Sequence, residues 1–237
     1  MTRFLKPFKP MFKAHTLFLL LLGWLLVLSG SVQSAPEAPL PDGELLTRLQ
    51  AGGLVIYFRH GLTDWSQSDH SPIRLKDCQA QRNLSQAGRD QMQAIGAAIE
   101  VLKIPLAKVL GSPYCRTMDS ARLAFGRVDV EDRLNYVGPM VGKPRLAQVE
   151  ALRRLLASNP PQGRNTVLVA HRGNLLEATG LDLEEGEAAI YIPDGVKGPR
   201  LVGRLTRAGW ESLVRTNAQN PSPEEECREP NRLPMGG

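Results

Sequence analysis

The stretch from Leu54 to Asp64 constrains the fold of this chain more than any other. It begins with a run of five apolar, strand-favouring residues, Leu54 to Phe58, and a continuous run of this kind predicts a buried strand of a parallel sheet. Arg59, His60 and Gly61 follow at its carboxyl end. Open α/β sheets bind ligands at that edge, so the stretch predicts a site that presents a cation beside a titratable ring nitrogen.

Two later stretches end in a similar way. Thr166 to Ala170 is a second run rich in β-branched residues, and His171 and Arg172 follow it directly. Val109 to Gly111 is a shorter apolar run, after which Arg116 falls about one turn into a predicted helix. Each of the three runs therefore delivers charged or titratable side chains at the end of a predicted strand.

Strand-like and helix-like runs alternate along the chain, which predicts a three-layer α/β/α sandwich with a mostly parallel central sheet. The predicted strands cover residues 54–58, 108–112, 127–130, 166–170, 187–193 and 201–205. The predicted helices cover residues 44–50, 113–125, 145–157 and 206–218, with a short helical run from 172 to 179.

The stretch from Asn83 to Met92 opens one further helix, which is long and amphipathic. Its predicted buried residues recur at helical spacing and are Gly88, Met92, Ile95, Ile99 and Leu102. The first helix of the domain is expected to be capped by Asp42 and ended by Gly52 and Gly53.

The sequence around the two arginine-histidine pairs, the Ser112–Ala121 stretch and the Asn83–Met92 stretch together resemble the histidine phosphatase superfamily, or phosphoglycerate mutase-like fold, in order and spacing. The resemblance covers roughly residues 50 to 215. Within the superfamily, the chain is similar to the exported lipopolysaccharide-core heptose phosphatases. It implies an enzyme that hydrolyses phosphoric monoesters through a phosphohistidine, with no metal or cofactor.

The resemblance also implies a role for each matching residue. His60 is the expected nucleophile, with its second ring nitrogen held by a backbone carbonyl. Arg59 and Arg116 are expected to bind the phosphoryl group, because a guanidinium offers a planar fork of donors to phosphate oxygens. His171 is expected to donate to the equatorial oxygens in the transition state. Arg172 stands where many members have glycine, so it either adds a third cation or points outward.

The general acid is left open among three carboxylates. Glu187 is the favoured one, because it is a lone charge at the mouth of a late, apolar predicted strand, where burial favours a protonated carboxyl group. Glu131 and Asp132 are the alternatives, since mutase-like relatives carry the acid shortly after the third strand. A solvated strand end explains that charged segment equally well.

Residues 62–82 form a polar insertion that is too long for a tight connection, which predicts that they wall or cover a pocket. Arg74 and Arg82 lie in this insertion. Two interpretations remain for them: they recognise a second anionic group on the substrate, or they are surface charge.

Residues 1–34 have the pattern of a secretory signal peptide, with a basic start, an apolar block from Leu17 to Leu28 and small residues before Ala35. An uncleaved anchor is the alternative. A proline-rich linker (35–43), the phosphatase domain (44–218) and a disordered tail (219–237) are expected to follow. This pattern predicts a periplasmic or secreted protein, in contact with a membrane only through the signal segment if that segment is retained.

Removing the signal segment changes the charge of the chain. It carries four of the 29 lysines and arginines and none of the 24 acidic residues, which leaves 25 against 24, or +1. The basic pI near 9.3 is therefore partly a targeting signature and does not indicate nucleic-acid binding. The expected partner is a small phosphorylated substrate.

Three cysteines lie in the exported part, where disulfides persist. A bridge between Cys78 and Cys115 is favoured because both lie near the predicted site, although Cys227 is an alternative partner for either. No Cys-x-x-Cys pair occurs and the histidines are scattered, so the sequence predicts no zinc site.

The predicted function is thus that of an exported, metal-independent phosphatase, with a phosphorylated sugar of the cell envelope as one substrate class. Two alternatives remain from the sequence. One is a phosphohistidine phosphatase, and the other is a protein of the same fold that binds phosphate or a phosphoglycan without turnover.

Overall fold

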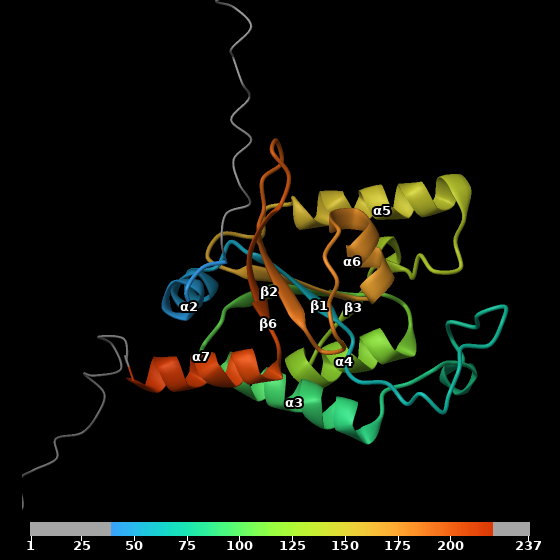
Figure 1. The fold of residues 1–237 in the computed structure, drawn as a ribbon, viewed down its shortest axis with the longest axis horizontal. Coiled ribbons are helices and arrows are strands. Elements are labelled where there is room, and N and C mark those ends of the chain that lie inside the picture. Colours follow the sequence, from blue (N-terminus) through green and yellow to red (C-terminus); the bar gives the residue numbers. More distant parts are fainter. Residues whose placement is uncertain (1–38, 220–237) are drawn as a thin grey trace, which may run out of the picture. The chain divides into compact units, whose positions relative to one another are not determined.

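The computed structural model describes residues 39–219. Their centre is a six-stranded sheet with the order β3-β2-β4-β1-β5-β6 (Figure 1). The strands are β1 (Val55–Arg59), β2 (Leu106–Gly111), β3 (Asp129–Val130), β4 (Asn165–Ala170), β5 (Ala188–Ile192) and β6 (Arg200–Leu205). Strands β3, β2, β4 and β1 are parallel to one another, whereas β5 and β6 join as antiparallel strands. The predicted α/β class with a mostly parallel sheet is confirmed.

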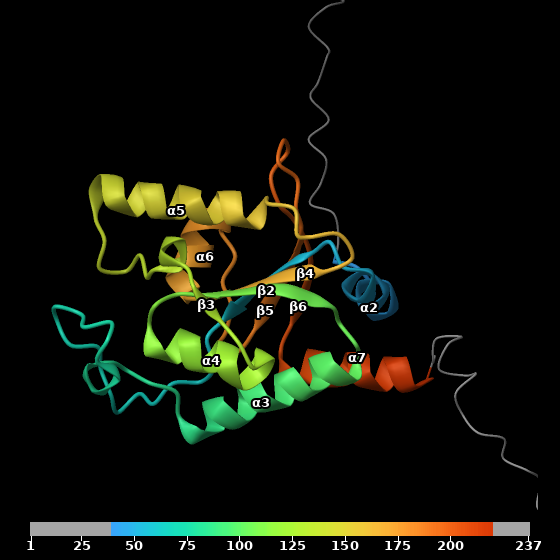
Figure 2. The ribbon, with the colours of Figure 1, turned by 180° about the vertical axis from the view of Figure 1, so that it is seen from behind.

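Helices cover both faces of this sheet, as the two opposite views show (Figures 1 and 2). One face carries α2 (Asp42–Ala51), α3 (Gln86–Val101), α4 (Cys115–Phe125) and α7 (Arg207–Gln219). The other face carries α5 (Gly142–Leu156) and α6 (Arg172–Thr179). The three-layer arrangement expected from the alternation of elements is therefore present.

The central strand β1 contributes to the core on both faces. Ile56 and Phe58 pack against the layer of α3, α4 and α7, while Val55 and Tyr57 pack against the layer of α5 and α6. All four side chains are fully buried. Successive residues of a strand point to opposite faces, so a strand covered on both sides must be apolar without alternation. This is why the first run of the sequence is continuous.

Helix α3 buries the face that the sequence predicts. Met92, Ile95 and Ile99 are buried in the core, and the side chain of Ser85 caps the helix by accepting a hydrogen bond from the N–H of Gly88. Gly88 has a further role, because a Cβ atom there would lie 1.9 Å from the carbonyl oxygen of Leu62. The missing side chain lets α3 approach the loop that follows β1.

The start of α2 differs from the expectation. The helix begins at Asp42, after Pro41, and no side chain caps it. Asp42 thus lies in the first turn, where a carboxylate interacts favourably with the positive end of the helix dipole without acting as the cap. The helix ends where expected, at Gly52 and Gly53, both of which have positive φ.

The insertion after β1 has little regular structure apart from the short 3-10 helix η1 (Cys78–Ala80). It is held by the disulfide between Cys78 and Cys115, which confirms the favoured pairing. Cys115 is the first residue of α4, and its N–H also donates to the side chain of Gln81 at 2.9 Å. The insertion is thereby fixed to the start of the helix that carries Arg116.

The predicted signal segment, residues 35–38 of the proline-rich linker and Cys227 in the predicted tail lie outside the described residues. Among residues 39–219, no helix is long and apolar enough to cross a membrane.

Gly88→Ala is expected to lower the free energy of unfolding by about 1–3 kcal/mol, because the new methyl group overlaps the backbone of Leu62 and forces α3 away from the loop. Urea denaturation measures the change. Gly43→Ala is the control: the position lies in α2 with open space around it, so the better helix propensity of alanine is expected to raise stability by about 0.5–1 kcal/mol. Equal effects of the two substitutions would contradict the close approach.

Candidate active site

Three parallel strands end side by side at one edge of the sheet and deliver the predicted site residues there. β1 ends at Arg59 and is followed by His60, β4 is followed by His171, and β2 leads into α4 with Arg116. A cavity of about 530 Å³ opens at this edge. It is lined by all four of these residues together with Trp65, Gln67, Ser68, Asp69, Arg82, Tyr136, Arg172 and Gly173.

His60 is buried and held in one tautomer. Its Nδ1 lies 2.9 Å from the carbonyl oxygen of Gly61, and a carbonyl can only accept, so Nδ1 carries the proton. Nε2 therefore keeps its lone pair, and none of the described residues forms a hydrogen bond with it. The ring thus keeps a nitrogen lone pair that is not engaged by any residue the structure describes.

Burial lowers the pKa of His60 well below its usual value, and the positive charge of Arg116 lowers it further. The pKa of His171 is lowered for the same two reasons, in the same order. Both rings are consequently neutral at physiological pH. Neutrality matters most for His60, because a protonated imidazole has no lone pair with which to attack phosphorus.

His171 is packed firmly beside His60. The two ring centroids are 5.6 Å apart, and the rings of Tyr114 and Tyr136 each lie 4.9 Å from that of His171. Its Nε2 is 2.8 Å from the hydroxyl oxygen of Ser112, and its backbone carbonyl accepts a hydrogen bond from Tyr57. These contacts fix the orientation of a ring that is expected to stabilise phosphoryl oxygens.

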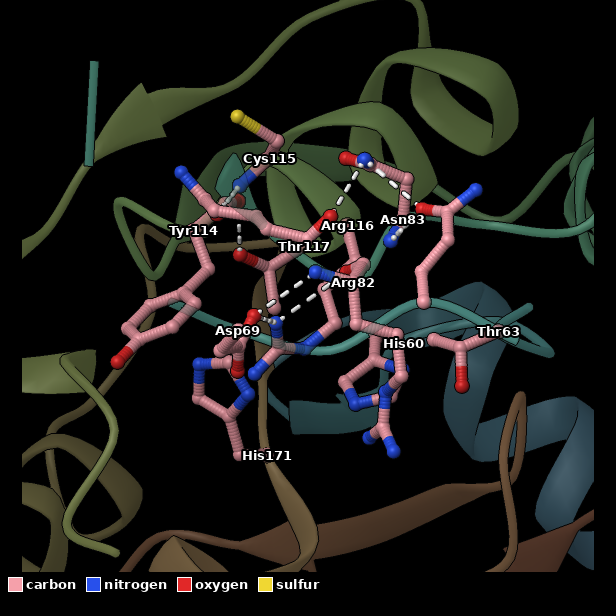
Figure 3. Close-up of polar contacts among 12 residues, drawn as sticks. His60, Thr63, Asp69, Arg82, Asn83, Tyr114, Cys115, Arg116, Thr117 and His171 are labelled. Carbon is pink, nitrogen blue, oxygen red and sulfur yellow. Dashed lines mark hydrogen bonds and ion pairs between the residues drawn. The ribbon is translucent and has the colours of Figure 1, made fainter. Parts of the chain in front are cut away.

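The two predicted phosphate-binding arginines are both buried and each contacts a carboxylate (Figure 3 shows Arg116). Arg59 donates to the carbonyl oxygen of Leu183 at 2.9 Å and to Glu185 at 3.2 Å. Arg116 donates to Oδ1 of Asp69 at 3.0 Å. Burial lowers the pKa of each guanidinium, yet both remain cations at any working pH.

Buried nitrogen atoms without a hydrogen-bond partner concentrate in this cavity. Six buried side-chain polar atoms of the described residues lack a partner, and four of them are Nε of Arg59, Arg82 and Arg116 and Nδ1 of His171. Buried polar groups are almost always satisfied in folded proteins. Four unsatisfied nitrogens around one cavity, three of them on cations, indicate that the natural ligand is an anion.

Arg172 lies at the rim of the cavity and is half exposed. Its guanidinium forms two hydrogen bonds with the carboxylate of Asp182, one of them 2.6 Å long. Arg172 therefore lines the cavity at its rim and does not belong to the group of buried arginines.

The structure does not bring Glu187 to the cavity. Its carboxylate accepts hydrogen bonds from Nε and Nη2 of Arg204, at 2.8 and 2.9 Å, and from the N–H of Glu184. The lone charge at the mouth of β5 thus has its partner on the neighbouring strand β6, which a linear sequence does not reveal. Both carboxylate oxygens of Glu187 are therefore engaged outside the cavity.

The other two predicted carboxylates also lie away from the cavity. Glu131 caps the short 3-10 helix η2 (Asp132–Leu134) and pairs with Arg133, and Asp132 lies within that helix. Glu131 is thus engaged at the strand end and Asp132 is exposed, which agrees with the alternative interpretation of this segment. Among the residues that line the cavity, the single carboxylate is Asp69.

The insertion walls the cavity, as its length predicts. Trp65, Asp69 and Arg82 come from it, and Trp65 is 71% exposed at the mouth. Arg74 instead pairs with Asp77 on the surface, outside the cavity. Asp69 was missed by the sequence analysis, because nothing in its local sequence marks a contact with Arg116, which is 47 residues away.

Comparisons with known proteins address the fold and the family. The family model described as "Histidine phosphatase superfamily (branch 1)" matches residues 55–144. Among solved structures, that of the open reading frame Rv3214 from Mycobacterium tuberculosis is 18% identical, with 65% of this chain and 98% of that chain covered and a TM-score of 0.45. No curated protein matches the sequence.

Two further solved structures are similar at the same level. The putative phosphohistidine phosphatase SixA from Agrobacterium tumefaciens is 18% identical, with 65% of this chain and 97% of that chain covered and a TM-score of 0.44. The mycobacterial glucosyl-3-phosphoglycerate phosphatase Rv2419c with VO3 is 20% identical, with 63% and 97% covered and a TM-score of 0.43.

The match to the family model confirms the resemblance that the motifs indicate. The matched stretch begins at β1 and includes His60 and Arg116. Over this stretch the chain is similar to the histidine phosphatase superfamily.

Breaking the Cys78–Cys115 disulfide is expected to lower the free energy of unfolding by about 2–4 kcal/mol, because the bridge closes a long loop that contains the insertion. Guanidinium unfolding with and without dithiothreitol measures the loss. A Cys78→Ser, Cys115→Ser double variant is the control and should be insensitive to the reductant. An unchanged midpoint in the wild type, with thiol titration proving reduction, would count against this anchoring role.

The low pKa values of His60 and His171 predict a specific dependence of stability on pH. Below about pH 6.5 both histidines bind protons in the unfolded chain but stay neutral in the native protein. The free energy of unfolding therefore falls with decreasing pH, by roughly 1.4 kcal/mol per pH unit for each histidine. His60→Gln should remove the contribution of one histidine from this pH dependence of the free energy of unfolding, as measured by urea denaturation from pH 7 to pH 5. His70→Gln, at an exposed position outside the cavity, is the control. Identical slopes in the wild type and His60→Gln would refute the assignment.

Proposed function

We propose that this protein is an exported phosphatase that hydrolyses phosphomonoesters through a phosphohistidine on His60, without a metal ion. The observation that carries the proposal is the state of His60: a buried, neutral ring with Nδ1 fixed on a carbonyl and a free Nε2. This nitrogen faces the cavity whose arginines have unpartnered nitrogens. A nucleophile and an anion-binding site therefore share one space.

In the first step Arg59 and Arg116 bind the phosphoryl dianion and hold it in line with Nε2 of His60. The lone pair of Nε2 forms a bond to phosphorus while the bond from phosphorus to the leaving oxygen breaks. That oxygen takes up a proton from the solvent and leaves as an alcohol. His171 and the arginines stabilise the charge on the equatorial oxygens. The product is a phosphohistidine.

In the second step a water molecule attacks the phosphorus of the phosphohistidine. Its oxygen bonds to phosphorus, the bond between phosphorus and Nε2 breaks, and inorganic phosphate leaves. The bonding pair returns to Nε2, which leaves His60 neutral. The proton lost by the water goes to the solvent, where it balances the proton that the leaving oxygen takes up in the first step. The same arginines serve both steps, because the phosphoryl group stays in place throughout.

Export and the envelope-sugar substrate are part of the proposal. The amino-terminal pattern supports export, and the Cys78–Cys115 disulfide agrees with it because disulfides persist in oxidising compartments. Trp65 and Tyr136, which line the cavity beside its cations, suit a phosphorylated sugar, because an aromatic face can pack against the apolar face of a sugar ring.

One observation keeps a second candidate, a phosphohistidine phosphatase. None of the three predicted acids reaches the cavity, and Asp69 is engaged by Arg116. A site without a free carboxylic acid favours substrates whose leaving group needs little help from one, and an imidazole that is protonated by solvent is such a group. Comparison of a phosphohistidine peptide with alkyl phosphates separates the two candidates.

The test is hydrolysis of p-nitrophenyl phosphate by the chain from Ala35 onward, in the presence of EDTA. We expect turnover in the chelator and a loss of at least about 10³-fold in kcat for His60→Ala, since the nucleophile is removed. His70→Ala is the control and should retain full activity. Rapid acid-free quenching with labelled substrate should trap the label on the wild type and not on His60→Ala.

Two outcomes would overturn the proposal. Inactivation by EDTA would contradict the metal-free mechanism. Binding of inorganic phosphate by a folded protein that turns over neither p-nitrophenyl phosphate, sugar phosphates nor a phosphohistidine peptide would identify a binding protein instead.

A further inference from the structure

We propose that Arg82 is a third phosphate-binding arginine of the site, which would contact the same phosphoryl group as Arg59 and Arg116. The inference rests on the proposed function only in taking a phosphoryl group as the ligand. Arg82 comes from the insertion and lies outside the motifs that indicate the family. It lines the cavity together with both other arginines, and Figure 3 shows it near Arg116.

The pairing of the cavity's arginines distinguishes Arg82. Arg59 contacts Glu185, Arg116 contacts Asp69, and Arg172 contacts Asp182. No carboxylate contacts the guanidinium of Arg82 within residues 39–219, and its Nε is buried without a hydrogen-bond partner. Arg82 is thus the lining arginine whose charge no acidic side chain offsets. A dianion would supply the missing acceptor.

The charge of Arg82 acts on the same groups that would hold the phosphoryl group. It contributes to lowering the pKa values of His60 and His171, and also those of Arg59 and Arg116. The guanidinium of Arg82 therefore lies within electrostatic range of all four groups. Its place in the lining of the same cavity, beside Arg116 and joined to it through Asp69, favours the phosphoryl group itself over a second anionic group farther along the substrate.

Contacts with its surroundings hold Arg82 in place before any ligand binds. The guanidinium carbon lies 4.0 Å from the ring centroid of Trp65, at cation–π distance. The backbone N–H of Arg82 donates to Oδ1 of Asp69 at 2.9 Å, and Nη1 of Arg116 lies 3.4 Å from the carbonyl oxygen of Arg82. The stacked face leaves the edge of the guanidinium, with its N–H groups, available to a ligand.

This arrangement also explains why the insertion is fastened so close to Arg116. Asp69 accepts from both the side chain of Arg116 and the backbone of Arg82, so one carboxylate sets the spacing of the two arginines. The Cys78–Cys115 disulfide fixes the same two segments at the residue before Arg116. Arg82 therefore comes from the insertion, but its position is set by contacts of the insertion with the start of α4.

The experiment measures the binding of inorganic phosphate by isothermal titration calorimetry and the kinetics of p-nitrophenyl phosphate hydrolysis, both on the intact protein. Arg82→Ala should weaken phosphate binding about tenfold or more, because it removes charge-assisted hydrogen bonds. Arg82→Lys should recover part of the affinity, since it keeps the charge and loses the planar fork. Trp65→Ala should weaken binding about two- to fivefold and Trp65→Phe less, because the ring supports the guanidinium.

Arg74→Ala is the matched control. Arg74 lies in the same insertion, pairs with Asp77 and does not line the cavity, so its loss should change phosphate affinity less than twofold. Thermal unfolding of each variant establishes that it is folded. Phosphate affinity within twofold of the wild type in folded Arg82→Ala would overturn the proposal.

A second outcome would also overturn it. If Arg82→Ala binds inorganic phosphate normally but loses affinity for bisphosphorylated sugars, the residue recognises a second anionic group instead. The phosphate-binding measurement is independent of turnover. A wild type without catalysis whose phosphate affinity still depends on Arg82 would sustain this inference while refuting the proposed hydrolysis.

Discussion

The parallel pairing of β1 with β4 is the interaction on which the site depends. Its register places Arg59 opposite Ala170, so the residues that follow, His60 and His171, leave the sheet side by side. The N–H of His60 donates to the carbonyl of Ala170, which extends the pairing into the site itself. A slip of one residue would turn every side chain of β1 to the opposite face of the sheet. The apolar side chains on both faces of β1 oppose such a slip by fixing its register in the core.

Burial has a chemical consequence as well as a structural one. Because the site lies at the end of buried strands and beneath an insertion, its histidines are desolvated and remain neutral. Burial of Arg59 and Arg116 would cost much free energy if the two guanidinium groups had no partners. The carboxylates of Glu185 and Asp69 offset that cost. Both buried arginines thus lie in ion pairs, and a dianion has to compete with those carboxylates. Within residues 39–219, no acidic side chain pairs with the guanidinium of Arg82, which adds an uncompensated positive charge to the cavity.

Much of this protein could be predicted from its sequence, and the exceptions share one physical cause. The strands were located to within a few residues, because strand pattern and burial are local properties of the chain. The structure brings the two predicted histidines and two predicted arginines to one cavity, because each lies at the end of a strand or at the start of a helix. The favoured disulfide was also identified. Glu187 lies away from the cavity because its partner, Arg204, comes from another strand, which consecutive residues do not reveal. Asp69 could not be predicted because its contact with Arg116 joins residues 47 positions apart.

The sequence by itself determined the layered α/β fold, the edge of the sheet that carries the site and the kinds of side chain delivered there. Periodicity and strand ends are written in consecutive residues, so they need no knowledge of distant contacts. Only the tertiary structure decided which carboxylates face which arginines, the tautomer of His60, and the place of Trp65 and Arg82 over the cavity. These features depend on the path of an insertion that has little regular structure. Hydrogen bonds and a disulfide fix this path in space, and no repeating pattern of residues in the sequence predicts it.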